Sequence, residues 1–237
     1  MLDVYWLEET EADVPPHNEW LCANEIDCLN AMQIPKRRAD WRLGRWTAKC
    51  AVASYLRIRS DPHTFSAMEI RATDTGAPQV LQAGDCLPIT ISISHSHGVA
   101  ACAVSEAGAA LGCDLEFFEP RSDAFITDFF AAEEQSLLAG VAAADRDHLA
   151  TLLWSAKESA LKTLQTGLRA DTRSAVVRVA DLMLPDAHDW HPLEVHIAGG
   201  PHFQGWWREA GDFVRTLVAA PAPAVPSVLD KSQFLVS

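Results

Sequence analysis

One short stretch of this sequence places two carboxylates where they could act together. Gly112-Cys113-Asp114-Leu115-Glu116 ends an apolar run that is typical of a β-strand. Asp114 and Glu116 are two residues apart, so on a strand both carboxylates project from the same face. Two acidic side chains on one face are a possible half of a metal site. They are also common on solvated strands, so the spacing alone does not decide.

A second stretch supplies a third carboxylate and an ammonium group. The segment 154–162, with the sequence WSAKESALK, is predicted to be helical. Glu158 and Lys162 are four residues apart and therefore lie on one face of the helix. If both stretches come together, three hard oxygen donors and one cation surround a point, which suits Mg²⁺ and substrate phosphate. The alternative is an ordinary surface ion pair between Glu158 and Lys162.

Composition bounds the class of protein. The 237 residues are 49% hydrophobic, enough for a sizeable core in one large domain or two small ones. The six cysteines show no C-x-x-C spacing, which predicts reduced thiols in a cytoplasmic protein. The acidic N-terminus does not resemble a signal peptide, and no run approaches the ~20 apolar residues of a membrane span.

The charge distribution is uneven. A net charge of −13 argues against nonspecific nucleic-acid binding. Residues 36–59, however, contain eight basic residues and one acidic residue. Within the helix expected from Pro35 to Leu56, a basic stripe recurs at helical spacing, made of Arg38, Arg42, Arg45 and Lys49. The stripe is either a solvated face or an anion site, and the planar fork of arginine favours the anion site.

The remaining pattern indicates an α+β protein. A long helix is expected from Asp147 to Gln165, with Trp154, Glu158 and Lys162 on the side opposite its apolar face. Strands are expected over residues 68–71, 89–95, 99–104, 109–116, 175–179, 193–197 and 213–219, and the rest of 60–88 as loops. We expect two similar lobes, 1–108 and 109–220, each a small antiparallel sheet packed with a long helix. An extended or disordered tail, 221–237, would follow.

Several motifs, taken in order, resemble the 4′-phosphopantetheinyl transferases of the surfactin-activating, two-lobed type. They are Lys36-Arg37-Arg38 with Leu43-Gly44-Arg45, Gly76-x-Pro78, Ser92-Ile93-Ser94-His95-Ser96, Gly112-x-Asp114-x-Glu116, Phe129-Phe130 with Glu134, and Trp154-Ser155-Ala156-Lys157-Glu158-Ser159 with Lys162. The resemblance covers residues 36–162. The ordered set is specific, although no single motif is.

The resemblance implies a monomeric pseudodimer of two α+β lobes with coenzyme A in the cleft between them. It implies a holo-[acyl-carrier-protein] synthase activity, in which the phosphopantetheine arm passes to a serine of an apo acyl or peptidyl carrier protein. Adenosine 3′,5′-bisphosphate is released. Because carrier proteins are typically acidic, we expect the partner to dock near the basic helix.

The functional residues of the family can be matched one by one to positions in this sequence. Asp114, Glu116 and Glu158 match the magnesium ligands, and Lys162 matches the lysine beside the pyrophosphate. The residues that match coenzyme A contacts are Ser94, His95, Arg37, Arg45 and, less closely, Arg71. Glu158, Lys162 and His95 are the catalytic candidates. The base for the incoming serine stays open among Glu158, Glu134 and a metal-bound water.

Some features remain open at this level. Ala77 stands where family members often have lysine, so one phosphate contact is missing or replaced. A non-catalytic homologue that binds coenzyme A or a carrier protein is an alternative, as is a Mg²⁺-dependent phosphoesterase. The pathway and the tolerance for acylated coenzyme A are not encoded in any motif.

Overall fold

The computed structural model describes residues 1–165, 171–179 and 189–230. The chain divides into two compact units. The N-terminal unit contains Asp3–Gly108 and the described residues from Ser227 onward, and the C-terminal unit contains Met1–Leu2 and Ala109–Pro226. Each unit has antiparallel strands and a long helix, which confirms the α+β class. The expected assignment of coenzyme A to the first lobe and of magnesium to the second stays a prediction.

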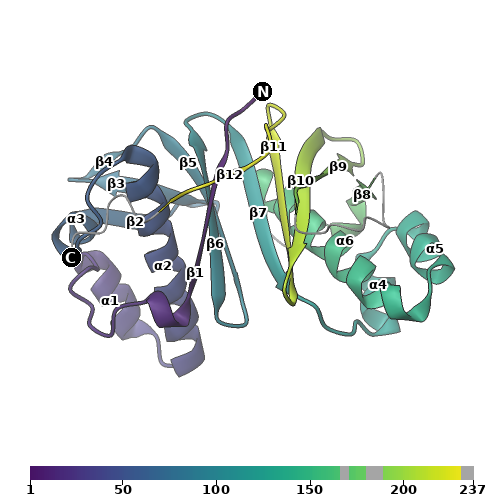
Figure 1. The fold of residues 1–237 in the computed structure, drawn as a ribbon, viewed down its shortest axis with the longest axis horizontal. Coiled ribbons are helices and arrows are strands. Elements are labelled where there is room, and N and C mark those ends of the chain that lie inside the picture. The colour runs from purple at the N-terminus through teal and green to yellow at the C-terminus, as the bar shows by residue number, and fades with distance from the viewer. Residues whose placement is uncertain (166–170, 180–188, 231–237) are drawn as a thin grey trace. The chain divides into compact units, whose positions relative to one another are not determined.

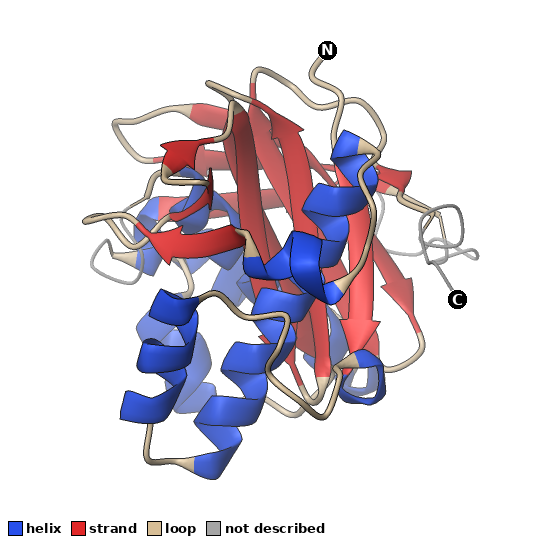
Figure 2. Cartoon of the chain, turned by 90° about the vertical axis from the view of Figure 1, so that its left-hand side faces the viewer, coloured by secondary structure: helices blue, strands red, loops and turns tan. Residues whose placement is uncertain are grey.

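The N-terminal unit contains two small sheets. The larger has the order β12-β1-β6-β5, formed by β1 (Tyr5–Thr10), β5 (Ile89–Ser96), β6 (Val99–Glu106) and β12 (Ser227–Val228). The smaller is formed by β2 (Met68–Ala72), β3 (Pro78–Gln82) and β4 (Asp85–Cys86). The helical elements are η1 (Glu11–Asp13), α1 (Ala23–Ala31), α2 (Pro35–Leu56) and α3 (Pro62–Ser66). Helix α2 packs on the larger sheet through its buried residues. Figure 2 colours the helices blue and the strands red.

The C-terminal unit has one antiparallel sheet of order β7-β11-β10-β9-β8. Its strands are β7 (Ala110–Phe117), β8 (Ala175–Val179), β9 (His191–Ile197), β10 (His202–Ala210) and β11 (Phe213–Ala220). Its helical elements are α4 (Asp123–Phe129), α5 (Ala132–Gly140), α6 (Ala143–Thr163) and η3 (Thr172–Ser174). Helix α6 lies against β7 and β11 (Figure 1), so the helix and the strand that carry the acidic residues are packed together.

Strand β10 is the main element that the sequence pattern did not predict. Its buried residues do alternate, as Phe203, Gly205 and Trp207. Glycine normally weakens a strand, and because Gly205 has no side chain, the alternation of apolar residues cannot be recognised in the sequence. Its reason is steric, because a Cβ at this position would lie 2.0 Å from the Leu217 carbonyl oxygen on β11. The short strand β3, in a region expected to be loops, was not predicted either.

A buried ion pair joins the helices of the N-terminal unit to its smaller sheet. Lys49 Nζ on α2 lies 2.5 Å from Glu25 Oε2 on α1, and both side chains are buried. Glu25 also accepts hydrogen bonds from the backbone N–H groups of Cys22 and Ile70. The two remaining lysine protons go to the carbonyls of Trp20 and Phe65. Every charge in this cluster is therefore matched.

The C-terminal unit repeats this arrangement. Lys157 Nζ on α6 lies 2.6 Å from Glu134 Oε2 on α5. Glu134 accepts hydrogen bonds from the N–H group just before its own helix, at Ala131, and from the N–H group of Val177 on β8. Lys157 donates to two further backbone carbonyls, those of Thr172 and Ala175. In both units a buried lysine pairs with a glutamate and donates to two backbone carbonyls, and the glutamate accepts from two backbone N–H groups. This repetition supports the expected similarity of the two lobes.

Some of the remaining expectations from the sequence agree with the structure and others do not. Helix α2 has the predicted bounds, whereas α6 begins at Ala143, four residues before the expected start. Three cysteines are buried, but Cys28 and Cys86 are exposed. Part of the expected tail forms β12, paired in parallel with β1, and residues 231–237 lie outside the described chain. Among the described residues, no helix has both the length and the hydropathy to cross a membrane.

Candidate active site

Asp114 and Glu116 lie on β7, which is the edge strand of its sheet beside α6. Asp114 is 3% exposed, and Lys162 Nζ on α6 lies 2.8 Å from its Oδ1 atom. The same ammonium donates to the carbonyl oxygen of Cys113 at 2.9 Å. The helix and the strand therefore meet as the sequence predicted. The result is a buried carboxylate–ammonium contact and not a solvated surface pair.

Gly112 makes this close approach of α6 and β7 possible. A Cβ atom at Gly112 would lie 1.9 Å from the Ser159 carbonyl oxygen and 2.5 Å from Thr163 Oγ1. Any side chain there would push the helix that carries Glu158 and Lys162 away from Asp114. The glycine is thus required for the spacing of the acidic site, because backbone cannot yield as a flexible side chain would.

Replacing Gly112 with alanine should lower the free energy of unfolding by about 1–3 kcal/mol, as overpacking does. Gly140→Ala is the matched control. No atom lies within 4 Å of a Cβ there, at the end of α5, so that change should be neutral or slightly stabilising. Urea unfolding of both variants measures the difference. Equal stability of the two variants would contradict the steric role of Gly112.

Glu116 is held by groups that the sequence pattern did not assign to the site. Trp154 Nε1 donates to Glu116 Oε1 at 3.1 Å, and Arg121 Nη2 lies 3.4 Å from Glu116 Oε2. Burial, and secondly the charge of Asp114, raise the pKa of Glu116 to about 7. Burial and Asp114 likewise raise the pKa of Glu158. The carboxylate of Asp114 on β7 therefore influences both Glu116 on the same strand and Glu158 on α6.

The raised pKa of Glu116 predicts a pH-dependent stability of the metal-free protein. Between the ordinary value of 4.5 and about 7, the folded state holds a proton that the unfolded state has lost. Stability should therefore fall as pH rises through this window. Urea unfolding at about pH 5 and about pH 8 tests the slope. Glu116→Gln should flatten it, and an unchanged slope in that variant would assign the effect to other groups.

One expectation about this region is wrong, and one of the three open alternatives for the base has a structural role. Trp154 does not lie on the solvent side of its helix; it is 9% exposed and packs against Phe125 and Phe129. The helix is buried on more than one face because α4 and α5 cover it as well as the sheet. Glu134, one of the possible bases, is occupied by three hydrogen-bonding partners in the buried ion pair. Its role is structural.

The donor set fits a divalent cation. Burial and the charge of Asp114 raise the pKa of Glu116 and of Glu158, and a hard cation bound among the three carboxylates would relieve this repulsion. Within the described residues, three ligand atoms of His, Cys, Asp or Glu lie within 4.8 Å of one another only at Glu194, His196 and His202. The oxygens of Asp114, Glu116 and Glu158 are therefore more widely spaced here, with Lys162 contacting Asp114.

In the N-terminal unit, two of the expected coenzyme A contacts line one hollow. A depression of about 370 Å³ is bordered by Ile34, Lys36, Arg37, Asp40, Trp41 and His95. His95 is exposed near the end of β5, whereas its neighbour Ser94 is buried. The hollow thus carries two cationic side chains and one imidazole beside an indole ring. These groups suit a phosphate and a planar base.

Arg45 and Arg71 differ in what they offer to an anion. The Arg45 guanidinium lies 4.7 Å from the centre of the Trp41 ring, and its Nε atom is buried without a hydrogen bond among the described residues. Arg71 is exposed, makes two 2.7 Å hydrogen bonds to Glu69, and does not border the hollow. The structure therefore groups Arg37, Arg45 and His95 around Trp41 and leaves Arg71 outside.

The basic stripe on α2 is mainly structural, contrary to the anion site that arginine chemistry favoured. Arg38 donates to the carbonyls of Leu29 and Met32, and Arg42 donates to that of Pro15. Lys49 is in the buried ion pair. The sequence could not show this, because the acceptors are backbone carbonyls of distant turns. Docking of a partner near this helix stays a prediction.

The family comparison supports the region that contains the acidic site. Residues 110–216 match the family model of the 4′-phosphopantetheinyl transferase superfamily. No curated protein sequence matches this chain.

Two solved structures show partial likeness. A holo-(acyl-carrier-protein) synthase from Bacillus anthracis strain Ames, in complex with CoA (3′,5′-ADP), is 20% identical with a TM-score of 0.38. The match covers 45% of this chain and 97% of that one. The Helicobacter pylori holo-[acyl-carrier-protein] synthase in complex with coenzyme A is 16% identical with a TM-score of 0.31, over 44% of this chain and 99% of that one. The matched residues 110–216 contain Asp114, Glu116, Glu158 and Lys162, so the likeness to the 4′-phosphopantetheinyl transferase superfamily includes the acidic site.

Proposed function

We propose that this protein transfers the 4′-phosphopantetheine group from coenzyme A to a serine of an apo acyl or peptidyl carrier protein, with Mg²⁺ as cofactor. The observation that carries the proposal is the contact of Lys162 with Asp114 inside the region that matches the transferase family. It assembles a cation and carboxylates from two distant segments. The two-lobed, surfactin-activating type is part of the proposal and rests on the motifs in the N-terminal unit.

In this reaction the serine oxygen attacks the phosphorus that carries the pantetheine arm. The bond from that phosphorus to the bridging oxygen breaks, and adenosine 3′,5′-bisphosphate leaves. Mg²⁺ held by Asp114, Glu116 and Glu158 would supply neutralisation of the diphosphate charge. Lys162 would stabilise negative charge on the leaving oxygen, because its ammonium already lies among the carboxylates.

Glu158 is the group that we propose for removal of the serine proton. Burial and the charge of Asp114 raise its pKa, which brings a carboxylate closer to the range of an effective base. Glu134, the other side chain considered, is fully engaged in the core. Arg37, Arg45, Ser94 and His95 would bind the nucleotide end of coenzyme A, and Arg71 would make a contact only if it left Glu69.

The decisive assay uses purified protein, coenzyme A, Mg²⁺ and an apo carrier protein. Transfer predicts that the intact carrier gains the mass of the phosphopantetheine group on its serine, and that adenosine 3′,5′-bisphosphate appears in equal amount. Hydrolysis of coenzyme A with no modified carrier would instead identify a phosphoesterase. Binding of coenzyme A without any product, tested with several carriers, would identify a non-catalytic homologue.

Arg37→Ala should raise the KM for coenzyme A about tenfold while leaving kcat nearly unchanged, since a phosphate contact in the ground state is also present in the transition state. Arg59→Ala is a suitable control, because the Arg59 side chain is 68% exposed and its ion pair with Asp61 is long, at 3.4 Å. Steady-state kinetics at varied coenzyme A concentration measures both. A loss confined to kcat would remove Arg37 from the binding site.

A further inference from the structure

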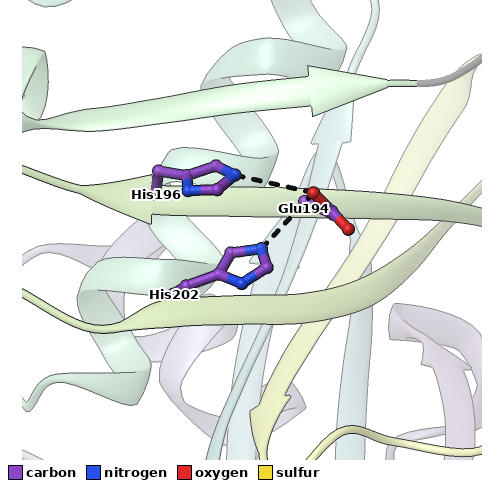
Figure 3. A group of neighbouring side chains, drawn as sticks. All are labelled: Glu194, His196 and His202. Atoms are coloured by element: carbon purple, nitrogen blue, oxygen red, sulfur yellow. Dashed lines mark ion pairs between the residues drawn. The ribbon is translucent and has the colours of Figure 1, made fainter.

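Two histidines and a glutamate gather on the sheet of the C-terminal unit, on strands that the proposed chemistry does not use. Figure 3 shows Glu194 and His196 on β9 and His202 on β10, with both imidazoles directed toward the glutamate. Each of the three offers a ligand atom within 4.8 Å of the others. Among the described residues, no other three histidine, cysteine, aspartate or glutamate side chains have ligand atoms this close together.

The strand register explains why these side chains meet. His202 pairs directly with His196 across the antiparallel β9–β10 ladder. Glu194 is two residues from His196, so it projects from the same face. The rings of His196 and His202 are stacked, with centres 4.0 Å apart and planes at 14°. The backbone therefore fixes all three positions without help from a loop.

The two spacings between imidazole nitrogen and glutamate oxygen match those of a tetrahedral metal ion. His196 Nε2 lies 3.5 Å and His202 Nε2 lies 3.4 Å from the same Glu194 Oε2 atom. Metal–ligand bonds of about 2.0–2.1 Å at tetrahedral angles place neighbouring ligand atoms about 3.4 Å apart. The side chains are about half exposed, so an ion can enter from solvent, and His196 Nε2 is buried without a hydrogen bond among the described residues.

The chemistry of the donors selects the kind of metal. Imidazole nitrogen favours Zn²⁺, Cu²⁺ and Ni²⁺, whereas Mg²⁺ prefers all-oxygen sites. Two histidines and one glutamate leave a fourth position for water or another ligand, as in open zinc sites. Gln204 lies opposite Glu194 on β10 and is placed to offer an amide oxygen. Arg178, opposite Glu194 on β8, adds a cation that would moderate the affinity.

We propose that Glu194, His196 and His202 form a binding site for Zn²⁺ or a similar borderline divalent ion, separate from the magnesium chemistry of Asp114, Glu116 and Glu158. Since the ligands come from both strands of the β9–β10 hairpin, a bound ion cross-links that hairpin. The ion binds the folded sheet and has no preformed site in the unfolded chain, so binding also stabilises the fold.

The test is a Zn²⁺ titration of the full-length, chelator-stripped protein in buffer with millimolar Mg²⁺, which keeps the all-carboxylate cluster supplied with its preferred ion. We expect one Zn²⁺ per chain and a rise in the unfolding midpoint temperature. His196→Ala and His202→Ala should each weaken binding at least ~10-fold, the lower end of what even outer-shell partners cost. Co²⁺ at the same site should show visible absorption typical of four or five ligands.

Matched variants separate binding at this site from binding at a surface histidine or at the acidic cluster. His17→Ala removes an exposed histidine from the other unit and should leave Zn²⁺ affinity unchanged. Glu158→Gln should also leave it unchanged, because that residue belongs to the acidic cluster. Equal Zn²⁺ affinity in wild type and the double variant His196→Ala/His202→Ala would overturn the proposal. So would an absence of Zn²⁺ binding by wild type at micromolar concentration, or loss of binding in Glu158→Gln.

Discussion

Glu158→Gln should lower kcat/KM for carrier-protein modification by at least ~10²-fold, the usual cost of one group that stabilises a phosphoryl- or acyl-transfer transition state. Two effects combine in this change. The amide is a weaker ligand for Mg²⁺, and it cannot accept the serine proton. The variant keeps the size of the side chain, so the packing of α6 on β7 is preserved, and the loss measures chemistry. Mass spectrometry of the carrier gives the rate.

The control for this variant is Glu133→Gln on α5. Glu133 is exposed and lies beside the buried Glu134, so its replacement alters net charge equally without touching the acidic cluster. We expect its activity to equal that of wild type. Urea unfolding of both variants checks that neither has lost stability. Full activity of a folded Glu158→Gln protein would show that Glu158 is neither a required ligand nor the base.

Lys157→Met should lower the free energy of unfolding by about 3–5 kcal/mol, which is typical when one partner of a buried ion pair is removed. The glutamate left behind, Glu134, is 2% exposed and would be a buried charge without its cation. The carbonyls of Thr172 and Ala175 also lose their donor. Methionine fills most of the space, so the loss reports electrostatics and hydrogen bonding rather than a cavity. Urea unfolding at neutral pH measures it.

Arg173→Met provides the surface comparison. Arg173 pairs with Asp171 at 2.9 Å, but both side chains are more than half exposed. Such pairs contribute ~1 kcal/mol or less, so the variant should be nearly as stable as wild type. In addition, Lys157→Met combined with Glu134→Gln should be less destabilised than the sum of the single changes, because no buried charge remains. Similar losses for Lys157→Met and Arg173→Met would reject the structural role assigned to the pair.

The N-terminal unit has the same kind of buried ion pair as the C-terminal unit but lacks its acidic site. Lys49 and Glu25 reproduce the contacts of Lys157 and Glu134. The residue after Lys49 is Cys50, where the C-terminal unit has Glu158, and the fifth residue after Lys49 is Ser54, where it has Lys162. The structural ion pair is thus present in both units, whereas the acidic helix positions occur in one.

Local sequence was sufficient for the long helices, most strands and the faces on which the acidic residues lie. The spacing of Asp114 with Glu116, and of Glu158 with Lys162, predicts shared faces because strand and helix periods are local properties. Pro35 marks the start of α2 in the sequence, whereas the left-handed backbone of Arg57 after its end is seen only in the structure. The ordered motifs then indicated the superfamily, whose model matches residues 110–216, whereas the two-lobed type stays a prediction.

Only the tertiary structure decided which charged residues are structural. Lys49, Arg38 and Glu134 looked available for chemistry in the sequence, yet each meets partners that are distant along the chain. The metal-ligand geometry of Glu194, His196 and His202 depends on the β9–β10 register, which no local pattern reports, since β10 itself was hidden by Gly205. Side-chain periodicity is set by neighbouring residues, whereas the burial and pairing of a charge are set by whatever the folded chain brings beside it.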